Sequence, residues 1–163
     1  GPEAARSADF WPLRMARELD DALLHLRLNE PELGLLVLRT EGDTGQVLAH
    51  DAFLEAHAAD WFIREVRHNL KRVLKRLDLT ARSLVALVEP GSCFAGTLAE
   101  LAFAADRSVM LAGTRAGGSN TPAAIALSPL NFGPYPMSNG LTRLQARFWG
   151  EPESIDAAQA RIG

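Results

Sequence analysis

Cysteine and long apolar runs are scarce in this sequence, and each shortage excludes a class of protein. A single cysteine, Cys93, cannot form a disulfide within the chain or supply a cysteine-rich zinc site. The longest apolar run, over 34–38, has the length of a strand, far short of the ~20 residues that span a bilayer. No basic segment followed by an apolar one marks a signal peptide at the start. We therefore expect a cytoplasmic protein with no membrane partner.

Positive charge is not in excess either. Lysine and arginine number 17 against 20 aspartates and glutamates, which gives a formal net charge of −3. Proteins that bind nucleic acids are usually basic, with the charge gathered on one face, so we expect no nucleic-acid partner. Hydrophobic residues make up 47% of the 163 residues, which is enough for a buried core and is not typical of a disordered chain.

The length fits one domain or part of a larger one. Gly1 and Pro2 resemble the residue pair that remains after a protease removes a tag, so we expect the natural sequence to begin near Glu3. Residues 1–9 are predicted to be this remnant and a short lead-in, and residues 10–163 are predicted to form a single domain.

Helical and strand patterns alternate along the chain. Apolar residues at three- and four-residue spacing predict helices, and continuous apolar runs predict strands that are covered on both faces. The order predicts an α/β fold with parallel strands and right-handed crossovers. The expected elements are a helix over 13–26, a strand over 33–38, a loop over 41–45, a helix over 51–77, a strand over 83–88, a helix over 98–105, a strand over 108–112, an exposed loop over 114–121, a short strand over 123–127, and helices over 139–149 and 153–162.

The sharpest local feature is residues 89–100, where a strand leads into a turn of small residues that opens a helix. Unpaired N–H groups at the start of a helix can hold an oxyanion or a phosphate. Glu100 lies in the first turn of that helix, so its carboxylate is placed for acid–base work on an acyl group. Alternatively, Glu100 only complements the helix dipole.

Three segments carry a resemblance to the crotonase (enoyl-CoA hydratase/isomerase) superfamily. Residues 96–106 (GTLAELAFAAD) resemble its GGGCELA…CD stretch. Residues 47–51 (VLAHD) take the place of its AGAD segment, and residues 131–144 resemble its later LG…P…GG…RL segment. The resemblance implies a crotonase-like ββα spiral core. In that superfamily two backbone N–H groups hold the thioester oxygen of an acyl-CoA, and glutamates transfer protons.

The resemblance also implies roles for single residues. It assigns the two N–H groups to His50 and Thr97, close approach of the backbone to Gly96, and acid–base chemistry to Glu100. Coenzyme A is implied as part of the substrate, with no separate cofactor and no metal. A homo-oligomer is also implied, since crotonase-type proteins commonly form trimers.

A narrower resemblance is to the C-terminal half of the benzoyl-CoA-dihydrodiol lyases. It rests on residues 11–22 (WPLRMARELDDA), 89–97 (EPGSCFAGT) and 131–141 (NFGPYPMSNGL). Enzymes of that family open the ring of 2,3-epoxybenzoyl-CoA and release formate in aerobic benzoate degradation. Their chains are longer, with two crotonase-like halves and the catalytic glutamates in the N-terminal one. The resemblance therefore implies a core that is truncated at the C-terminus and whose partners are an acyl-CoA substrate and the rest of a parent chain.

The sequence departs from the crotonase pattern at two positions. Thr97 stands where active members have a glycine of the oxyanion site. The second catalytic glutamate is expected near Pro129, but no carboxylate lies between Asp106 and Glu151. These departures favour a catalytically inactive structural or oligomerisation domain. A fragment of a generic acyl-CoA hydratase or isomerase stays an alternative.

Other candidate residues have simpler interpretations. His50 and His57 are seven residues apart, which does not match the spacing of zinc ligands on one helix. Cys93 has no histidine close in sequence and is predicted to be a buried structural thiol. The second half of the predicted helix over 51–77 is basic, which indicates a solvated face or, alternatively, a contact with the phosphates of coenzyme A.

Overall fold

The computed structural model describes residues 1–113 and 121–163 and contains two small parallel sheets. The larger sheet has the order β1-β2-β4, which confirms the predicted α/β class with parallel strands. The loop predicted over 114–121 lies outside the described residues except for its last position. The strands are β1 (Leu35–Leu38), β2 (Ser83–Val88) and β4 (Arg107–Met110) in the larger sheet, and β3 (Phe94–Ala95) and β5 (Ile125–Ala126) in the smaller one.

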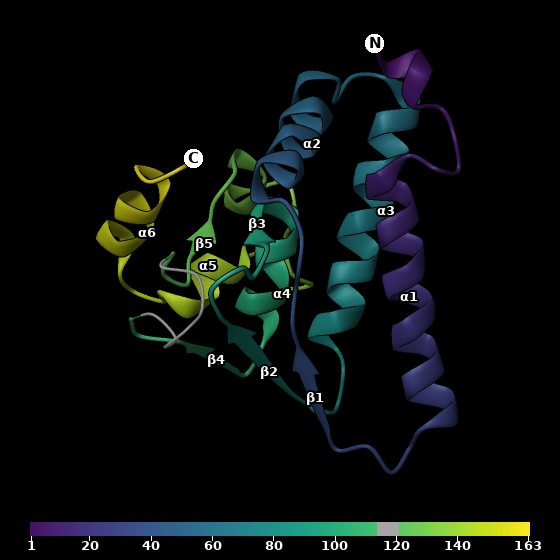
Figure 1. Ribbon diagram of the computed structural model, residues 1–163. Coiled ribbons are helices and arrows are strands. Elements are labelled where there is room, and N and C mark those ends of the chain that lie inside the picture. Colours follow the sequence, from purple (N-terminus) through teal and green to yellow (C-terminus); the bar gives the residue numbers. More distant parts are fainter. Residues whose placement is uncertain (114–120) are drawn as a thin grey trace.

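Helices lie mainly to one side of the larger sheet, with α1 and α3 side by side (Figure 1). The helices are α1 (Trp11–Asn29), α2 (Thr44–Ala56), α3 (Trp61–Asp78), α4 (Ala99–Ala104), α5 (Arg143–Arg147) and α6 (Pro152–Gln159), with the 3-10 turns η1 (Pro2–Ala5), η2 (Gly96–Leu98) and η3 (Pro129–Phe132). Within the described residues, no helix is long and apolar enough to cross a bilayer.

The single helix predicted over 51–77 is wrong, because the structure divides this region into α2 and α3. Asp60 ends the connection between them, and its carboxylate accepts hydrogen bonds from the backbone N–H groups of Phe62 and Ile63. Asp43 caps α2 in the same way by accepting from Gln46, so α2 begins inside the predicted loop. Both helices bury one face, so apolar residues keep their helical spacing on either side of the break between α2 and α3. Spacing alone therefore does not reveal the break, which is marked by the cap at Asp60.

The hydrophobic core lies between the helices and one face of the sheet. Helix α3 contributes most of its apolar face, and β2 contributes Leu84, Ala86 and Val88, each at most 3% exposed. On the opposite face Leu35 and Val37 of β1 are 55% and 51% exposed. The expectation that these strands are covered on both faces is therefore wrong for β1 within the described residues.

The first residues pack against the body of the molecule. Ala5 is nearly buried and belongs to the main hydrophobic core. The guanidinium of Arg6 donates to the carboxylate of Asp60 at 2.9 Å and lies over the ring of Trp61, 5.5 Å from its centroid. The predicted lead-in over residues 1–9 thus holds a 3-10 turn and a tertiary contact to the cap of α3.

Candidate functional site

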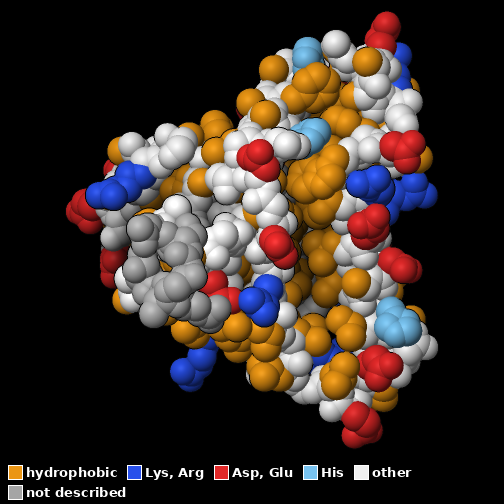
Figure 2. Space-filling view, viewed as in Figure 1, with side chains coloured by type: hydrophobic (Ala, Val, Ile, Leu, Met, Phe, Trp, Pro, Cys, Tyr) orange, Lys and Arg blue, Asp and Glu red, His pale blue; other side chains and the backbone are white. Residues whose placement is uncertain are grey.

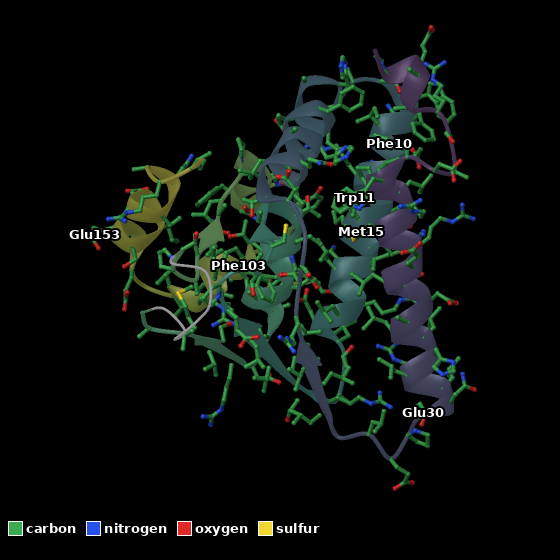
Figure 3. The ribbon with its side chains drawn as sticks, in the orientation of Figure 1. Phe10, Trp11, Met15, Glu30, Phe103 and Glu153 are labelled. Carbon is green, nitrogen blue, oxygen red and sulfur yellow. The ribbon has the colours of Figure 1, made fainter. Side chains whose placement is uncertain are left out.

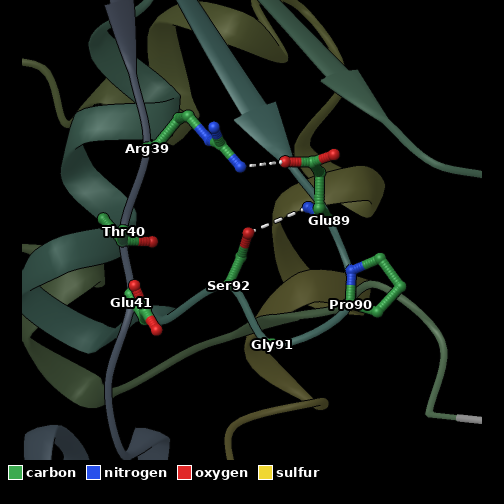
Figure 4. Close-up of a pocket in the computed structure, with 7 residues that line it drawn as sticks. All are labelled: Arg39, Thr40, Glu41, Glu89, Pro90, Gly91 and Ser92. Atoms are coloured by element: carbon green, nitrogen blue, oxygen red, sulfur yellow. Dashed lines mark hydrogen bonds and ion pairs between the residues drawn. The ribbon is translucent and has the colours of Figure 1, made fainter. Parts of the chain in front are cut away.

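The predicted site begins where β2 leads into β3 and η2. Ser92 shapes the intervening turn, because its hydroxyl accepts a hydrogen bond from the N–H of Glu89 at 2.9 Å (Figure 4). Gly96 then adopts a φ of +46°, which few residues other than glycine adopt. A Cβ at this position would come within 2.0 Å of Oδ2 of Asp51. The group that lies close to the Gly96 backbone in the structure is therefore the side chain of Asp51 on α2.

Asp51 is the centre of the first half of a buried polar cluster. The cluster comprises the buried residues Asp51, Thr97, Glu100, Ser128, Asn131, Tyr135 and Arg143, together with Asp78, which is partly buried. Asp51 is 1% exposed, and its carboxylate accepts from Thr97 N–H at 2.8 Å, from the Thr97 hydroxyl at 2.5 Å and from the Ser128 hydroxyl at 2.6 Å. Burial raises the pKa of Asp51, and these hydrogen bonds oppose the rise.

Glu100 is the centre of the second half. It lies in the first turn of α4, as predicted, and is 1% exposed. One carboxylate oxygen accepts from Asn131 Nδ2 and the other from Arg143 Nη1, both at 2.7 Å. Burial raises the pKa of Glu100, and the Arg143 guanidinium opposes this rise. Both carboxylate oxygens of Glu100 therefore have a hydrogen-bond partner, and the side chain is closed off from solvent.

Arg143 joins Glu100 to a second carboxylate. Its Nε and Nη2 donate to the two carboxylate oxygens of Asp78 at 2.9 and 2.6 Å, while Nη1 also donates to the backbone carbonyl of Tyr135. Arg143 is itself 1% exposed. Charge-assisted hydrogen bonds therefore fix all three nitrogens of the guanidinium, two of them to Asp78 and the third to Glu100. Arg143 is the shared cation of both carboxylates, so its removal would leave their charge uncompensated.

Turn η3 connects the two halves of the cluster. The Ser128 hydroxyl donates to Asp51, and its backbone N–H donates to Asn131 Oδ1 at 2.9 Å. The Asn131 amide then donates both to Glu100 and to the carbonyl of Gly96. The predicted position of a second glutamate, Pro129, lies in this turn. Pro129 follows Ser128, whose hydroxyl donates to Asp51, so the carboxylate that reaches this turn besides Glu100 is that of Asp51 on α2.

Neither of the two N–H groups predicted to hold a thioester oxygen is available in the structure. His50 lies in the middle of α2, where backbone N–H groups are used within the helix. The N–H of Thr97 is engaged by Asp51. The imidazole of His50 stacks on Trp11, with 5.1 Å between ring centroids and 23° between planes. Phe10 and Trp11 lie between the start of α1 and α2 (Figure 3).

Two of the cavities among the described residues lie by the loop over residues 39–43 and the turn before β3, and no residue of the cluster lines either of them. One of about 490 Å³ lies beyond the carboxyl ends of β1 and β2 and contains an ion pair between Arg39 and Glu89 at 2.7 Å (Figure 4). The other, of about 240 Å³, is lined by His50, Cys93 and neighbouring residues. Cys93 is 1% exposed and burial raises the pKa of its thiol, so the prediction that this thiol is buried is confirmed.

Comparison with known proteins gives one informative match. No protein-family model matches the chain. Benzoyl-CoA-dihydrodiol lyase from Aromatoleum evansii is 51% identical over 159 residues, which cover 98% of this chain and 28% of that protein. The chain is a relative of this lyase. The resemblance to benzoyl-CoA-dihydrodiol lyases predicted from the sequence motifs is thereby confirmed. The chain spans little more than a quarter of the lyase's length.

Of the polar cluster, only Thr97 and Glu100 were predicted as site residues from the sequence. Asn131 and Arg143 lie in the segment that carried the crotonase resemblance, but the motif gave no reason to pair them with Glu100. Ser128 and Asn131 form a capping box around η3, and that local pattern was a usable signal. The contact from Asp51 to Ser128 joins residues 77 positions apart, and no local pattern reports it.

Proposed function

We propose that this chain is a crotonase-like domain within a longer benzoyl-CoA-dihydrodiol lyase. The identity of 51% to such a lyase over almost the whole chain is the observation that carries the proposal. The parallel α/β arrangement and the strand–turn–helix at residues 88–100 are compatible with a ββα spiral core. The parent enzyme would open 2,3-epoxybenzoyl-CoA with release of formate, taking coenzyme A only as part of its substrate.

Within that enzyme, the domain's role is structural rather than catalytic. The carboxylate of Asp51 occupies the hydrogen-bonding position at Thr97 where a thioester oxygen would have to bind. Each carboxylate oxygen of Glu100 already accepts a hydrogen bond, one from Asn131 and one from Arg143, and the side chain is buried. An active site needs donors that are free to meet developing charge, and the donors of this cluster are already committed. The parent chain would act in the cytoplasm as a homo-oligomer, with its proton-transfer residues outside this domain.

Calorimetric titration tests the structural role directly. Coenzyme A and benzoyl-CoA, each titrated to millimolar concentration against this chain, should give no binding heat. The longer lyase, titrated in the same way with benzoyl-CoA, is the positive control. Saturable heat with the 163-residue chain would contradict the structural role and indicate an autonomous acyl-CoA site.

Measuring turnover of the longer lyase tests whether Glu100 takes part in the reaction. Glu100→Gln should leave turnover per folded molecule close to that of the parent protein, because Glu100 does not meet the substrate. Normalisation to folded protein is needed, since a neutral amide at this position cannot replace the ion pair with Arg143. A loss of turnover with an unchanged folded fraction would place Glu100 in the chemistry.

A fragment of an acyl-CoA hydratase or isomerase is the second candidate function. It is favoured by the two buried carboxylates, Asp51 and Glu100, whose pKa values are both raised by burial, because such pairs are typical of acid–base sites. Asp51 would have to leave Thr97 to admit a substrate. Hydration of crotonyl-CoA that disappears in Glu100→Gln, but persists in the control Glu89→Gln, would support this candidate over the structural role.

A further inference from the structure

The larger sheet has one apolar face that nothing among the described residues covers fully. On β1, Leu35 and Val37 are 55% and 51% exposed, and on β4 Val109 is 54% exposed. The register pairs Val37 with Val85, and Leu87 with Val109, so β2 continues the same face. Hydrophobic side chains gather over these strands at the lower edge of the molecule (Figure 2). We call Leu35, Val37, Val85, Leu87 and Val109 the open face.

Parallel sheets are almost always covered on both faces, and their strands carry apolar residues on both sides for that reason. Strand β2 follows this pattern, with Leu84, Ala86 and Val88 buried on the inner side and Val85 and Leu87 on the open face. The open face thus has the composition of a covered surface. None of the described residues covers it fully.

The area of the open face indicates whether a separate protein molecule or a segment of the same polypeptide covers it. With about 4.8 Å between strands and about 3.3 Å per residue, three strands of four to six residues present roughly 200–300 Å². A stable complex of two free proteins buries about 800 Å² on each partner, so this face alone would hold a second copy weakly. A tethered element needs far less area, because the tether keeps it at a high effective concentration.

We propose that an amphipathic helix from another part of the longer lyase packs on the open face. This rests on the proposed function, in which the chain is one domain of a polypeptide more than three times its length. A helix is the natural cover of a parallel sheet. Arg107 lies on the same side of β4 as Val109 and pairs in register with Val85, so an acidic residue bordering the helix's apolar stripe would complete the contact.

Photo-cross-linking in the longer lyase tests this proposal. p-Benzoylphenylalanine is placed at Val37 in one variant and at Val109 in another, so that misfolding of one leaves the other to decide. The matched control is the same substitution at Leu28, an apolar residue that is 72% exposed but belongs to helix α1 rather than to the sheet. Cross-linked products are separated by mass, and their peptides are identified by mass spectrometry.

Both sheet probes should give products of single-chain mass whose peptides join this domain to a segment outside residues 1–163, in several-fold higher yield than the Leu28 probe. Products joining two copies would overturn the proposal in favour of a dimer. Yields no higher than that of the control would overturn it in favour of a solvated face. The proposed function is judged separately, by lyase turnover of the unmodified longer protein, so failure of one is distinguishable from failure of the other.

Discussion

The buried polar cluster and the open face reverse the usual distribution of polar and apolar side chains. In the cluster, Asp51, Glu100 and Arg143 are each 1% exposed. Arg143 pairs with Glu100 and with the partly buried Asp78, and Asp51 accepts hydrogen bonds from Thr97 and Ser128. On the open face, aliphatic side chains remain half exposed. Among the described residues, then, the cluster has its hydrogen-bond partners in place, while one face of the larger sheet stays partly exposed. The cluster is fixed by contacts within this domain, whereas the exposure of the sheet agrees with our proposal that another part of a longer chain covers it.

The strongest test of the fixed centre is Arg143→Met. This change leaves the carboxylates of Glu100 and Asp78 buried without their cation, so we expect a loss of about 3–5 kcal/mol in the free energy of unfolding. Urea denaturation followed by circular dichroism measures it. Arg14→Met is the matched control, because Arg14 pairs with Glu18 on the surface and should change stability by no more than about 1 kcal/mol. Equal effects at the two positions would show that the cluster is not the fixed centre.

Gly96→Ala is expected to have the next largest effect. The new Cβ would meet Asp51 Oδ2 at 2.0 Å in a backbone conformation with φ of +46°, so we expect a loss of roughly 1–3 kcal/mol. Asp51→Ser removes the clashing carboxylate. In a double-mutant cycle measured by urea denaturation, Gly96→Ala should therefore cost less in the Asp51→Ser background than in the parent. Strict additivity would contradict the contact between the two residues.

Asp51→Asn tests the ionisation of the centre through pH. The pKa of Asp51 is raised in the folded protein, so the folded state binds this proton more tightly than the unfolded state does. Its contribution to stability is therefore complete below the unfolded pKa of about 3.9 and is lost as the pH rises through the folded pKa. The unfolding free energy of the parent minus that of the variant should therefore decrease as the pH rises from about 4. Urea denaturation of both proteins at a series of pH values measures this quantity. A flat difference would show that Asp51 has an ordinary pKa.

The smallest effect is expected on the open face. Val37→Thr should change the stability of this chain by less than about 0.5 kcal/mol, because the side chain is half exposed. Val88→Thr, on the inner side of β2 and fully buried, should cost about 1–3 kcal/mol, since it buries a hydroxyl. Thermal or urea unfolding of both variants gives the comparison. A large cost at Val37 would mean that the face is already covered within this chain.

The sequence allowed the fold class to be predicted better than the site. Continuous apolar runs over 33–38 and 83–88 gave the parallel strands correctly, because such runs depend only on local composition. The break between α2 and α3 was missed, although Asp60 followed by apolar residues is a capping signal. The position of Glu100 was predicted from its segment. Its partners were not, because Arg143 and Asn131 reach it across 43 and 31 residues.

The double engagement of Thr97 by Asp51 has a consequence for engineering. Both the N–H and the hydroxyl of Thr97 donate to the same carboxylate, so replacing the threonine by the glycine of active crotonases would remove only the hydroxyl. The backbone donor would stay occupied. A designer who wishes to open an acyl-CoA site in this scaffold has to begin in helix α2, at position 51, and only then turn to the loop that resembles a catalytic motif.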